Sequence, residues 1–600
     1  MQRHSEFKPI HTILVPFVHN GPGMSMLDAT RHFDAEIILV GVVVVPEGES
    51  LSTGAAAARS LRKTLRVFGK DPRVTSKSQI IVSYEPWMEL SSFIIEERPD
   101  LLFLDYEAHP KALRVSLNKV MEQPPCDIAL VRGKLVSKPK QVLVPVRGGP
   151  HAELALRVGL GLYSKGVTAL HIRRPNDPEA GSDAPFKGLG QVLQQITDVK
   201  TDFAVTDDAA SLILEQSKSS DVIILGTTQQ PMTSSVSFGP VADRILREAP
   251  ATVIAVKSGR PMPQVMYDES AGVEAISILV DKWFAENTFH ADEFNQLREL
   301  VELKKQQGVT ISLALPALNE EQTVGKVIKM MKKELMKRVP LLDEIVLIDS
   351  DSTDRTREIA KKEGVPVYIH QQLLERLKPR RGKGEALWKS LLVTKGDIIV
   401  WIDTDIVNIH PRFVYGIIGP LLINPQVQFV KGFYRRPLRV GQKMQAGGGG
   451  RVTELTARPL LNLFFPALSG VVQPLSGEYA GRRSALEQAT FYSGYGVETG
   501  LLIDVYERYG LNAIAQVDLL ERIHHNQHLE ALSKMSFAII QTVFRKLEKR
   551  FGRAVLEDVN RSMKLIRHGQ KGYSLEVEQI AEYERPPMIE VPEYLERKIK

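Results

Sequence analysis

Two aspartates that follow an apolar segment are the residues of this sequence best suited to chemistry. The segment Ile398–Trp401 is β-prone, and Asp403 and Asp405 follow it two residues apart. On a strand this spacing puts both carboxylates on one face, at the carboxyl edge of the sheet, where open α/β sheets bind ligands. Two carboxylates there suit a hard divalent cation, which would hold a substrate diphosphate. Such triplets also occur on loops and at helix caps, so the neighbouring motifs must decide whether this one is a metal site.

Three segments upstream of the aspartates carry groups that suit a nucleotide. A strand ending at Pro316 leads through polar residues into a helical run, and a helix start favours phosphate. Asn319 could instead simply cap that helix. A second strand stops at Asp349 and Ser350, where Asp349 could bind a ribose. Glycines on both sides of Lys383 allow close backbone approach, so that this lysine could place a cation on a diphosphate; a solvated basic loop is the alternative.

A glycine-rich loop downstream of the aspartates suits an anionic acceptor. Gly447–Gly450 permit a tight loop, and Arg451 and Thr453 add a guanidinium, a hydroxyl and helix N–H groups around an anion. A flexible linker is the alternative. Further on, Glu478 and Glu498 lie among apolar residues and glycines, where a carboxylate is costly to bury unless it binds something.

The segment Arg522–Asn526 contains an arginine, two histidines and an asparagine. His524 could add an imidazole to the metal site, and Arg522 and Asn526 could bind the acceptor. Two adjacent histidines are usually an exposed pair with no functional role. A site at this segment is favoured here because the other motifs occur in the same sequence.

The composition is that of a globular protein of several domains. Six hundred residues predict two to four domains, and 43% hydrophobic with 25% charged residues is ordinary. The net charge of +6 suits small anionic substrates, and without a basic block it predicts no nucleic-acid partner. The single cysteine, Cys126, excludes an internal disulfide and is expected to be buried. Because no signal core or uninterrupted apolar span is found, we expect a cytoplasmic protein with no membrane partner.

The first 258 residues contain two copies of one pattern of short strands and helices. Strands at 11–16 and 140–145 open the copies, and strands at 127–131 and 252–256 close them. Apolar strands alternating with helices indicate βαβ units and a parallel sheet.

Each copy resembles a universal stress protein domain. In that family an Asp follows the first strand, and a G-x2-G-x9-G-[ST] loop binds the ATP phosphates. The second copy keeps only Gly226 and Gly239-Pro240 of that loop, the first copy lacks it, and neither has the Asp. We therefore expect a structural or regulatory module, with nucleotide binding as the alternative.

From about Trp283 to Leu532 the sequence resembles the glucosyl-3-phosphoglycerate synthases, a family of retaining glycosyltransferases with the GT-A fold. The resemblance rests on Pro316–Glu321, the Lys383 loop, the Asp-x-Asp, and the runs Phe-Tyr-Arg-Arg-Pro-Leu, Gly-Gly-Gly-Arg-Val-Thr-Glu-Leu and Gln-Pro-Leu-Ser-Gly-Glu-Tyr-Ala, in that order. It implies an α/β chain in which two universal-stress-protein-like, Rossmann-like domains with parallel sheets precede a GT-A glycosyltransferase domain.

The same resemblance implies roles for individual residues. The donor nucleotide-sugar would contact Pro316, Ala317, Leu318, Asn319, Glu320, Ser350, Lys383 and Asp403. The acceptor would contact Gly450, Arg451, Thr453, Arg522 and Asn526. Asp405 and His524 would bind Mg²⁺ or Mn²⁺, and the residues acting on the reacting groups would be Glu498, Lys383 and Asp405. Thr404 departs from the serine often found between the two aspartates; its side chain points away from them on a strand, so we expect little effect.

The implied reaction moves glucose from UDP-glucose, or GDP-glucose, to the 2-hydroxyl of 3-phospho-D-glycerate. The hydroxyl would attack from the leaving-group side, which retains configuration, and a diphosphate oxygen could take its proton, so no protein base is named. Rival predictions are a transferase using GDP-mannose or a polyprenyl-phosphate acceptor, and a nucleotide-sensing regulatory protein. We expect a homodimer.

The predicted organisation has five parts. Universal-stress-protein-like domains occupy 1–135 and 136–258, and a linker covers 259–275. The GT-A domain occupies 276–550, and 551–600 form a helical and extended tail.

Overall fold

The computed structural model describes the chain as two compact units, residues 1–270 and 271–600. Its described residues are 9–30, 32–69, 71–122, 124–135, 139–146, 150–163, 166–173, 199–227, 238–259, 273–435, 438–440, 443–445, 450–523, 528–556, 561–569 and 572–599. Over these ranges we find no helix both long and apolar enough to cross a membrane.

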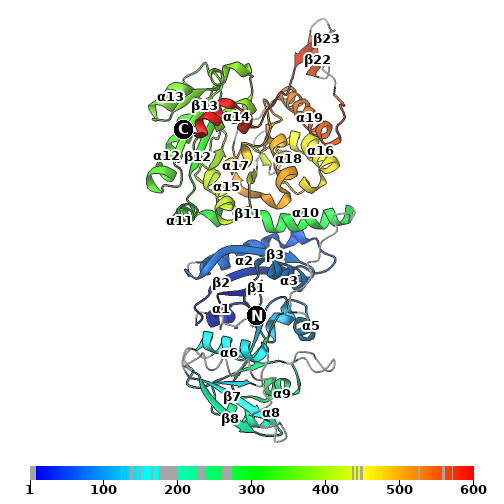
Figure 1. Ribbon diagram of the computed structural model, residues 1–600. Coiled ribbons are helices and arrows are strands. Elements are labelled where there is room, and N and C mark those ends of the chain that lie inside the picture. Colours follow the sequence, from blue (N-terminus) through cyan, green and yellow to red (C-terminus); the bar gives the residue numbers. More distant parts are fainter. Residues whose placement is uncertain are drawn as a thin grey trace. The chain divides into compact units, whose positions relative to one another are not determined.

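The first unit is built on one ten-stranded sheet with the order β3-β2-β1-β4-β5-β10-β9-β6-β7-β8 (Figure 1). The strands are β1 (Thr12–Val18), β2 (Glu36–Val44), β3 (Val74–Ser83), β4 (Leu101–Asp105), β5 (Ile128–Arg132), β6 (Val142–Val146), β7 (Val167–Arg173), β8 (Lys200–Val205), β9 (Val222–Gly226) and β10 (Thr252–Lys257). Each half has the strand order 3-2-1-4-5 with parallel pairing, and the halves meet where β5 and β10 pair antiparallel. The predicted repeat and its Rossmann-like parallel sheets are therefore found, although both halves share one sheet. The domain boundaries themselves stay a prediction.

Helices accompany these strands as the alternating pattern requires. They are α1 (Met24–Thr30), α2 (Ala55–Phe68), α3 (Pro86–Glu97), α4 (Ala108–Ala112), α5 (Leu117–Glu122), α6 (Pro150–Leu162), α8 (Ala209–Ser217) and α9 (Pro240–Glu248). The central strands are apolar throughout because both sheet faces are covered, and every residue of β10 is buried. Cys126, expected to be buried, is only partly so; it precedes β5 in a turn, where its thiol donates to the carbonyl of Asp127.

The second unit is built on an eight-stranded sheet with the order β11-β21-β16-β19-β15-β12-β13-β14. Its strands are β11 (Thr288–His290), β12 (Ile311–Ala317), β13 (Glu344–Asp349), β14 (Val367–Ile369), β15 (Ile398–Trp401), β16 (Phe429–Arg435), β19 (Tyr479–Arg482) and β21 (Ile514–Glu521). Only β19 runs antiparallel to its neighbours, β15 and β16. Most strands therefore end at one edge of the sheet.

The larger helices of this unit cover both faces of the sheet. They are α10 (Val273–Asn287), α11 (Leu297–Gln307), α12 (Val324–Lys332), α13 (Thr356–Lys362), α14 (Lys383–Val393), α15 (Arg412–Ile423), α16 (Arg458–Phe464), α17 (Arg483–Leu486), α18 (Val497–Tyr509), α19 (Leu529–Phe551) and α20 (Pro592–Ile599). Strand β15 shows the layering, since Ile398 and Val400 pack into one core and Ile399 and Trp401 into the other. Its polar groups can therefore lie only beyond its end.

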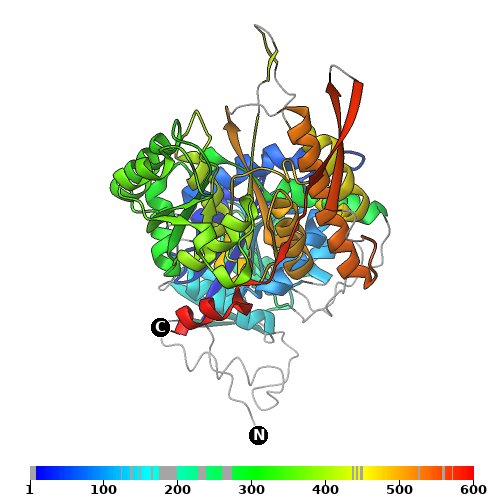
Figure 2. The same ribbon diagram turned by 90° about the horizontal axis from the view of Figure 1, so that it is seen from above.

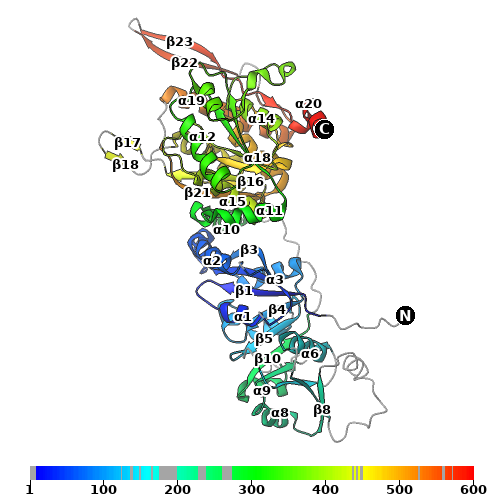
Figure 3. The same ribbon diagram turned by 90° about the vertical axis from the view of Figure 1, so that its left-hand side faces the viewer.

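Three two-stranded elements complete the second unit. They are β17 (Leu438–Val440) with β18 (Lys443–Gln445), β20 (Phe491–Tyr492) with β24 (Glu584–Arg585), and β22 (Ser562–Gly569) with β23 (Gly572–Gln579). The β22–β23 hairpin lies next to α19 and projects from the unit (Figures 2 and 3). The end of the chain returns to the body, because Met588, Val591 and Tyr594 are buried in a core cluster.

We predict that Trp283→Ala destabilises the second unit by about 3–5 kcal/mol, as is usual for a buried tryptophan. Trp283 is 1% exposed and its indole N–H donates to the carbonyl of Ile514 at 2.8 Å, which joins α10 to β21. Urea unfolding measures the change. The matched control is Ile278→Ala on the exposed side of α10, and an equal loss in both variants would contradict this account.

Candidate active site

The two aspartates lie just beyond β15, at the carboxyl edge of the parallel strands. Asp403 and Asp405 are partly exposed, whereas Thr404 between them is buried. The Thr404 hydroxyl donates to the carbonyl of Pro316 at 2.9 Å. The middle side chain thus points away from the carboxylates, as predicted, and ties this loop to the end of β12.

Of the residues that the structure describes, Lys383 is one of two cations that pair with these carboxylates. It is the first residue of α14, directly after Gly382, whose φ of +130° favours glycine. Its Nζ lies 2.7 Å from Asp403 Oδ1 and 3.0 Å from Glu498 Oε1. Burial alone would lower the pKa of Lys383, but Asp403 and Glu498 outweigh it and raise that pKa well above its ordinary value. Lys383 is therefore a permanent cation between two carboxylates.

Arg522 joins the remaining acids of the site. Its Nη1 lies 3.1 Å from Asp403 Oδ2 and 2.9 Å from Glu478 Oε1, and its Nη2 lies 2.5 Å from Asp405 Oδ1. Nη1 also donates to the hydroxyl of Tyr434 at 2.7 Å. The fully buried Glu478 thus has the binding partner that its apolar surroundings required. Burial would raise the pKa of Asp403, but Lys383 and Arg522 overcome this and hold it well below its ordinary value.

Lys431 is the site residue that sequence reasoning missed. It lies in β16, 1% exposed, with Nζ 2.7 Å from the carbonyl of Ser476 and 4.2 Å from the ring centre of Tyr479. Burial lowers its pKa to about 7, although Glu498 opposes the shift. A lysine in the middle of an apolar strand was the available signal, because such a side chain must find a polar site inside the protein.

The loops after β12 and β13 hold each other in place. Asn319 has a left-handed φ of +57°, and its Oδ1 accepts from the N–H of Thr353 at 2.8 Å. Its own N–H donates to the hydroxyl of Ser352, which in turn donates to Asp349 at 2.6 Å. The interpretation of Asn319 as a helix cap is therefore wrong. Asp349 is fully buried and supports this loop rather than facing a ribose.

The predicted donor residues form the exposed rim of these loops. Pro316 and Ser350 are half-buried, Leu318 is exposed, and the buried Ala317 accepts the N–H of Ser350 with its carbonyl. Burial raises the pKa of Glu320, and the nearby Asp405 and Asp403 add to the rise. This places Glu320 beside the aspartate pair.

The predicted acceptor residues are only partly described. Gly450, with a φ of +91°, precedes a helical segment that begins at the exposed Arg451 and includes the buried Thr453. His524 and Asn526 lie outside the described residues. Their roles, and the metal pair Asp405–His524, stay predictions.

The donor set at the edge fits a divalent cation. Asp403 and Asp405 offer carboxylate oxygens, the ligands that Mg²⁺ and Mn²⁺ prefer. Both carboxylates also pair with the guanidinium of Arg522, so a metal ion would share these oxygens with it. Among the described residues no third side chain completes a metal-ligating group with them, and a further ligand would come from outside these residues, as predicted for His524.

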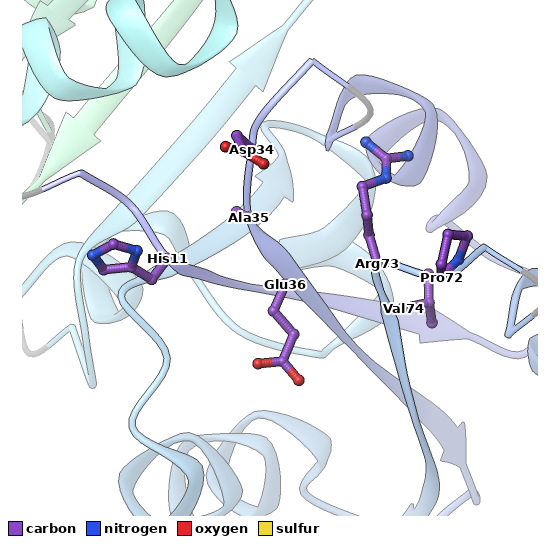
Figure 4. Close-up of a pocket in the computed structure, with 7 residues that line it drawn as sticks. All are labelled: His11, Asp34, Ala35, Glu36, Pro72, Arg73 and Val74. Carbon is purple, nitrogen blue, oxygen red and sulfur yellow. The ribbon is translucent and has the colours of Figure 1, made fainter. Parts of the chain in front are cut away.

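Two pockets lie in the first unit. One, shown in Figure 4, lies where β1, β2 and β3 begin; its lining residues are His11, Asp34, Ala35, Glu36, Pro72, Arg73 and Val74. This is the amino edge of the strands, opposite the usual ligand edge. The other lies at the carboxyl ends of β1 and β2, and its lining includes Asn20, Glu49, Lys111 and Arg114.

The part of the chain that carries the site is similar in sequence to known glycosyltransferases. Residues 312–486 match the sequence profile of glycosyl transferase family 2. The chain is 52% identical over 311 residues to glucosyl-3-phosphoglycerate synthase from Petrotoga mobilis, spanning 52% of this chain and 95% of that enzyme. The enzyme of the same name from Mycolicibacterium smegmatis is 50% identical over 236 residues, spanning 39% and 77%.

Two solved structures of enzymes are also similar in sequence to part of this chain. Mannosyl-3-phosphoglycerate synthase from Rubrobacter xylanophilus is 40% identical with a TM-score of 0.48, covering 52% of this chain and 98% of its own. Glucosyl-3-phosphoglycerate synthase from Mycobacterium tuberculosis, in complex with Mn²⁺ and UDP-glucose, is 43% identical with a TM-score of 0.42, covering 49% and 94%.

The mainly parallel sheet, the aspartate pair at its edge and the family 2 match define a glycosyltransferase of the GT-A type. At 52% identity over nearly the whole Petrotoga enzyme, the chain belongs to the glucosyl-3-phosphoglycerate synthase family.

We predict that Lys431→Met stabilises the protein more at pH 6 than at pH 9, by about 2–3 kcal/mol. The folded pKa of Lys431, about 7, is below the unfolded value, so between these values the unfolded chain binds more protons and wild-type stability rises with pH. The substitution removes that dependence. Urea unfolding at both pH values measures it, with the exposed Lys362→Met as control. The same gain at both pH values would contradict the assignment.

Proposed function

We propose that the second unit transfers glucose from UDP-glucose to the 2-hydroxyl of 3-phospho-D-glycerate with retention of configuration. The observation that carries this proposal is Lys383 held between Asp403 and Glu498 at the carboxyl edge of the sheet. The name of the Petrotoga relative supplies the sugar and the acceptor.

On the donor side, the nucleotide would lie against the rim formed by Pro316–Glu320 and Ser350. The ammonium group of Lys383 would bind the diphosphate, and the ion pair with Asp403 would orient this ammonium group. Asp405, together with His524, would hold Mg²⁺ or Mn²⁺. When bound, that ion offsets the charge that develops on the departing UDP.

On the acceptor side, the helix start at Arg451 and Thr453 would bind the phosphate of phosphoglycerate, with Gly450 allowing close approach. Arg522, assisted by Asn526, would bind the acceptor from the other side. Glu498 would accept hydrogen bonds from glucose hydroxyls near the anomeric carbon.

The reaction would follow from this arrangement. The acceptor hydroxyl attacks the anomeric carbon from the side that UDP leaves, the bond to the diphosphate oxygen breaks, and a diphosphate oxygen takes the proton. Lys383 stabilises the leaving group because it is already oriented and protonated.

The direct test is incubation of the purified protein with UDP-glucose, 3-phosphoglycerate and Mg²⁺. We expect a phosphorylated glucosylglycerate by mass, its loss on chelation, and an α-anomer by NMR. Product only with GDP-glucose would identify that nucleotide-sugar as the donor, whereas product only with GDP-mannose or with a polyprenyl-phosphate acceptor would establish one of the rival transferases. No product with any of them would favour the nucleotide-sensing alternative.

We predict that Asp405→Ala lowers turnover at least ~10²-fold, through lost stabilisation of charge in the transition state. Steady-state rates at saturating metal measure the effect. The control is Asp351→Ala, an exposed aspartate on the loop after β13. Near-normal turnover of the Asp405 variant would rule out its metal role.

The protein would act as a homodimer through the β22–β23 hairpin. The face of the hairpin that carries Arg567 and Glu578 is fixed to α19 by ion pairs with Glu530 and Lys534. The opposite face exposes apolar side chains, which are Ile566, Tyr573, Leu575 and Val577. A two-stranded hairpin with an exposed apolar face needs a covering surface, and we propose a second copy of the chain.

We predict that the triple variant Ile566→Ser/Leu575→Ser/Val577→Ser is monomeric in sedimentation. The wild type should sediment as a dimer. The control is Glu576→Gln, which replaces an exposed residue on the face of the hairpin that is fixed to α19. A monomeric wild type would contradict the dimer.

The first unit would be a regulatory pair of universal-stress-protein-like domains in a cytoplasmic enzyme. The strand order shared by the two halves supports the pair. Because Thr228 and Gln229 lie outside the described residues, the remnant phosphate loop of the second copy stays a prediction.

A further inference from the structure

The extended segment Ile580–Arg585 joins the β22–β23 hairpin to the end of the chain. It contributes no residue to the site described above, yet it contacts the starts of two helices that do. One is α14, which begins with Lys383, and the other is α18, whose second residue is Glu498. The final helix α20 also lies beside α14 (Figures 1 and 3), where Arg597 donates to the carbonyl of Val393.

Glu582 lies at the start of α18. Its two carboxylate oxygens accept the N–H groups of Gly494 and Tyr495, both at 2.9 Å. These residues lie just before Gly496, the N-cap of α18, and a negative charge is favoured near a helix N-terminus. Glu582 thus fixes the turn that leads into α18, at positions four and three residues before Glu498.

Arg585 fixes the start of α14 in the same manner. Its Nε and Nη2 bind both oxygens of Glu385, at 2.7 and 2.8 Å. Nη1 and Nη2 also donate to the carbonyls of Leu377 and Lys378, each at 2.8 Å. Glu385 is fully buried, so this bidentate pair is shielded from water. One guanidinium therefore ties together the first turn of α14 and the loop that leads into it.

Strand β20 connects the two attachments. It pairs with β24 through Phe491 and Tyr492, and the carbonyl of Ser493 accepts the N–H of Glu385 at 2.9 Å. The approach to α14 is so close that a side chain at Gly384 would overlap the carbonyl of Tyr492. The segment, β20 and both helices form one continuous set of contacts.

We propose that Glu582 and Arg585 are positioning residues for the pair Lys383–Glu498. Each fixes the start of one helix, so that the Nζ of Lys383 and the carboxylate of Glu498 meet at 3.0 Å. The inference rests on the proposed roles of Lys383 and Glu498 in glucosyl transfer.

The test compares Glu582→Gln and Arg585→Lys with the control Glu593→Gln. Glutamine keeps the size of Glu582 but replaces one acceptor oxygen, and lysine keeps the charge of Arg585 but not its fork. Glu593 is paired with the exposed Arg376 and does not touch either helix start. We expect kcat to fall at least ~10-fold in both test variants, with KM for UDP-glucose and 3-phosphoglycerate changed less than ~3-fold, because orientation rather than binding is lost.

A second measurement separates positioning from folding. Glu385 also pairs with the buried Lys389 at 3.2 Å, so all three charges are removed together in Glu385→Gln/Lys389→Met/Arg585→Gln. Thermal stability of this variant should recover relative to Arg585→Gln while kcat stays low. Recovery of both would overturn the proposal, as would unchanged kcat in the single variants or an equal loss in Glu593→Gln.

Amide hydrogen exchange keeps the test independent of the reaction. We expect faster exchange over 377–387 and 494–500 in the two test variants but not in the control. A wild type without transferase activity would defeat the proposed function alone, whereas unchanged exchange in these segments would defeat the positioning role.

Discussion

The structure of the site depends on keeping unlike charges close together at a partly buried edge of the sheet. Lys383 lies between Asp403 and Glu498, and Arg522 lies among Asp403, Asp405 and Glu478. Buried charges are tolerated only when each is paired. Arg522 is the cation that Asp405 and Glu478 share, so moving it would take this partner from both, and the network orients each group before any substrate binds.

This constraint explains the architecture around the site. Parallel strands with apolar residues on both faces bring β12, β13 and β15 to a common edge, and β19 and β21 carry Glu478 and Arg522 to the same place. The helices that hold Lys383 and Glu498 start at that edge. Lys431, partly neutral near pH 7, adds a group whose charge is sensitive to its neighbours. Such preorganised electrostatics are what a transferase needs to stabilise a departing diphosphate.

Much of this could be predicted from sequence, because the relevant signals are local. The apolar, β-prone run Ile398–Trp401 predicted a strand, and the spacing of Asp403 and Asp405 predicted a shared face. The repeated strand pattern of the first 258 residues predicted two matching halves of one topology. What could not be predicted depends on contacts distant in sequence. Arg522 meets Asp405 across 117 positions, and Arg585 meets Glu385 across 200. Asn319 shows the same limit. Its local sequence suggested a helix cap, but its side chain instead accepts a hydrogen bond from Thr353 on the next loop.

The most direct test of the account is calorimetric titration of UDP into the protein with and without Mn²⁺, for the wild type and for Lys383→Met. If the charged edge of the sheet is a donor site, UDP should bind at least ~10-fold more tightly with Mn²⁺, and the variant should bind more weakly than the wild type in both conditions. Equal UDP affinity with and without Mn²⁺, unaffected by the loss of Lys383, would contradict it.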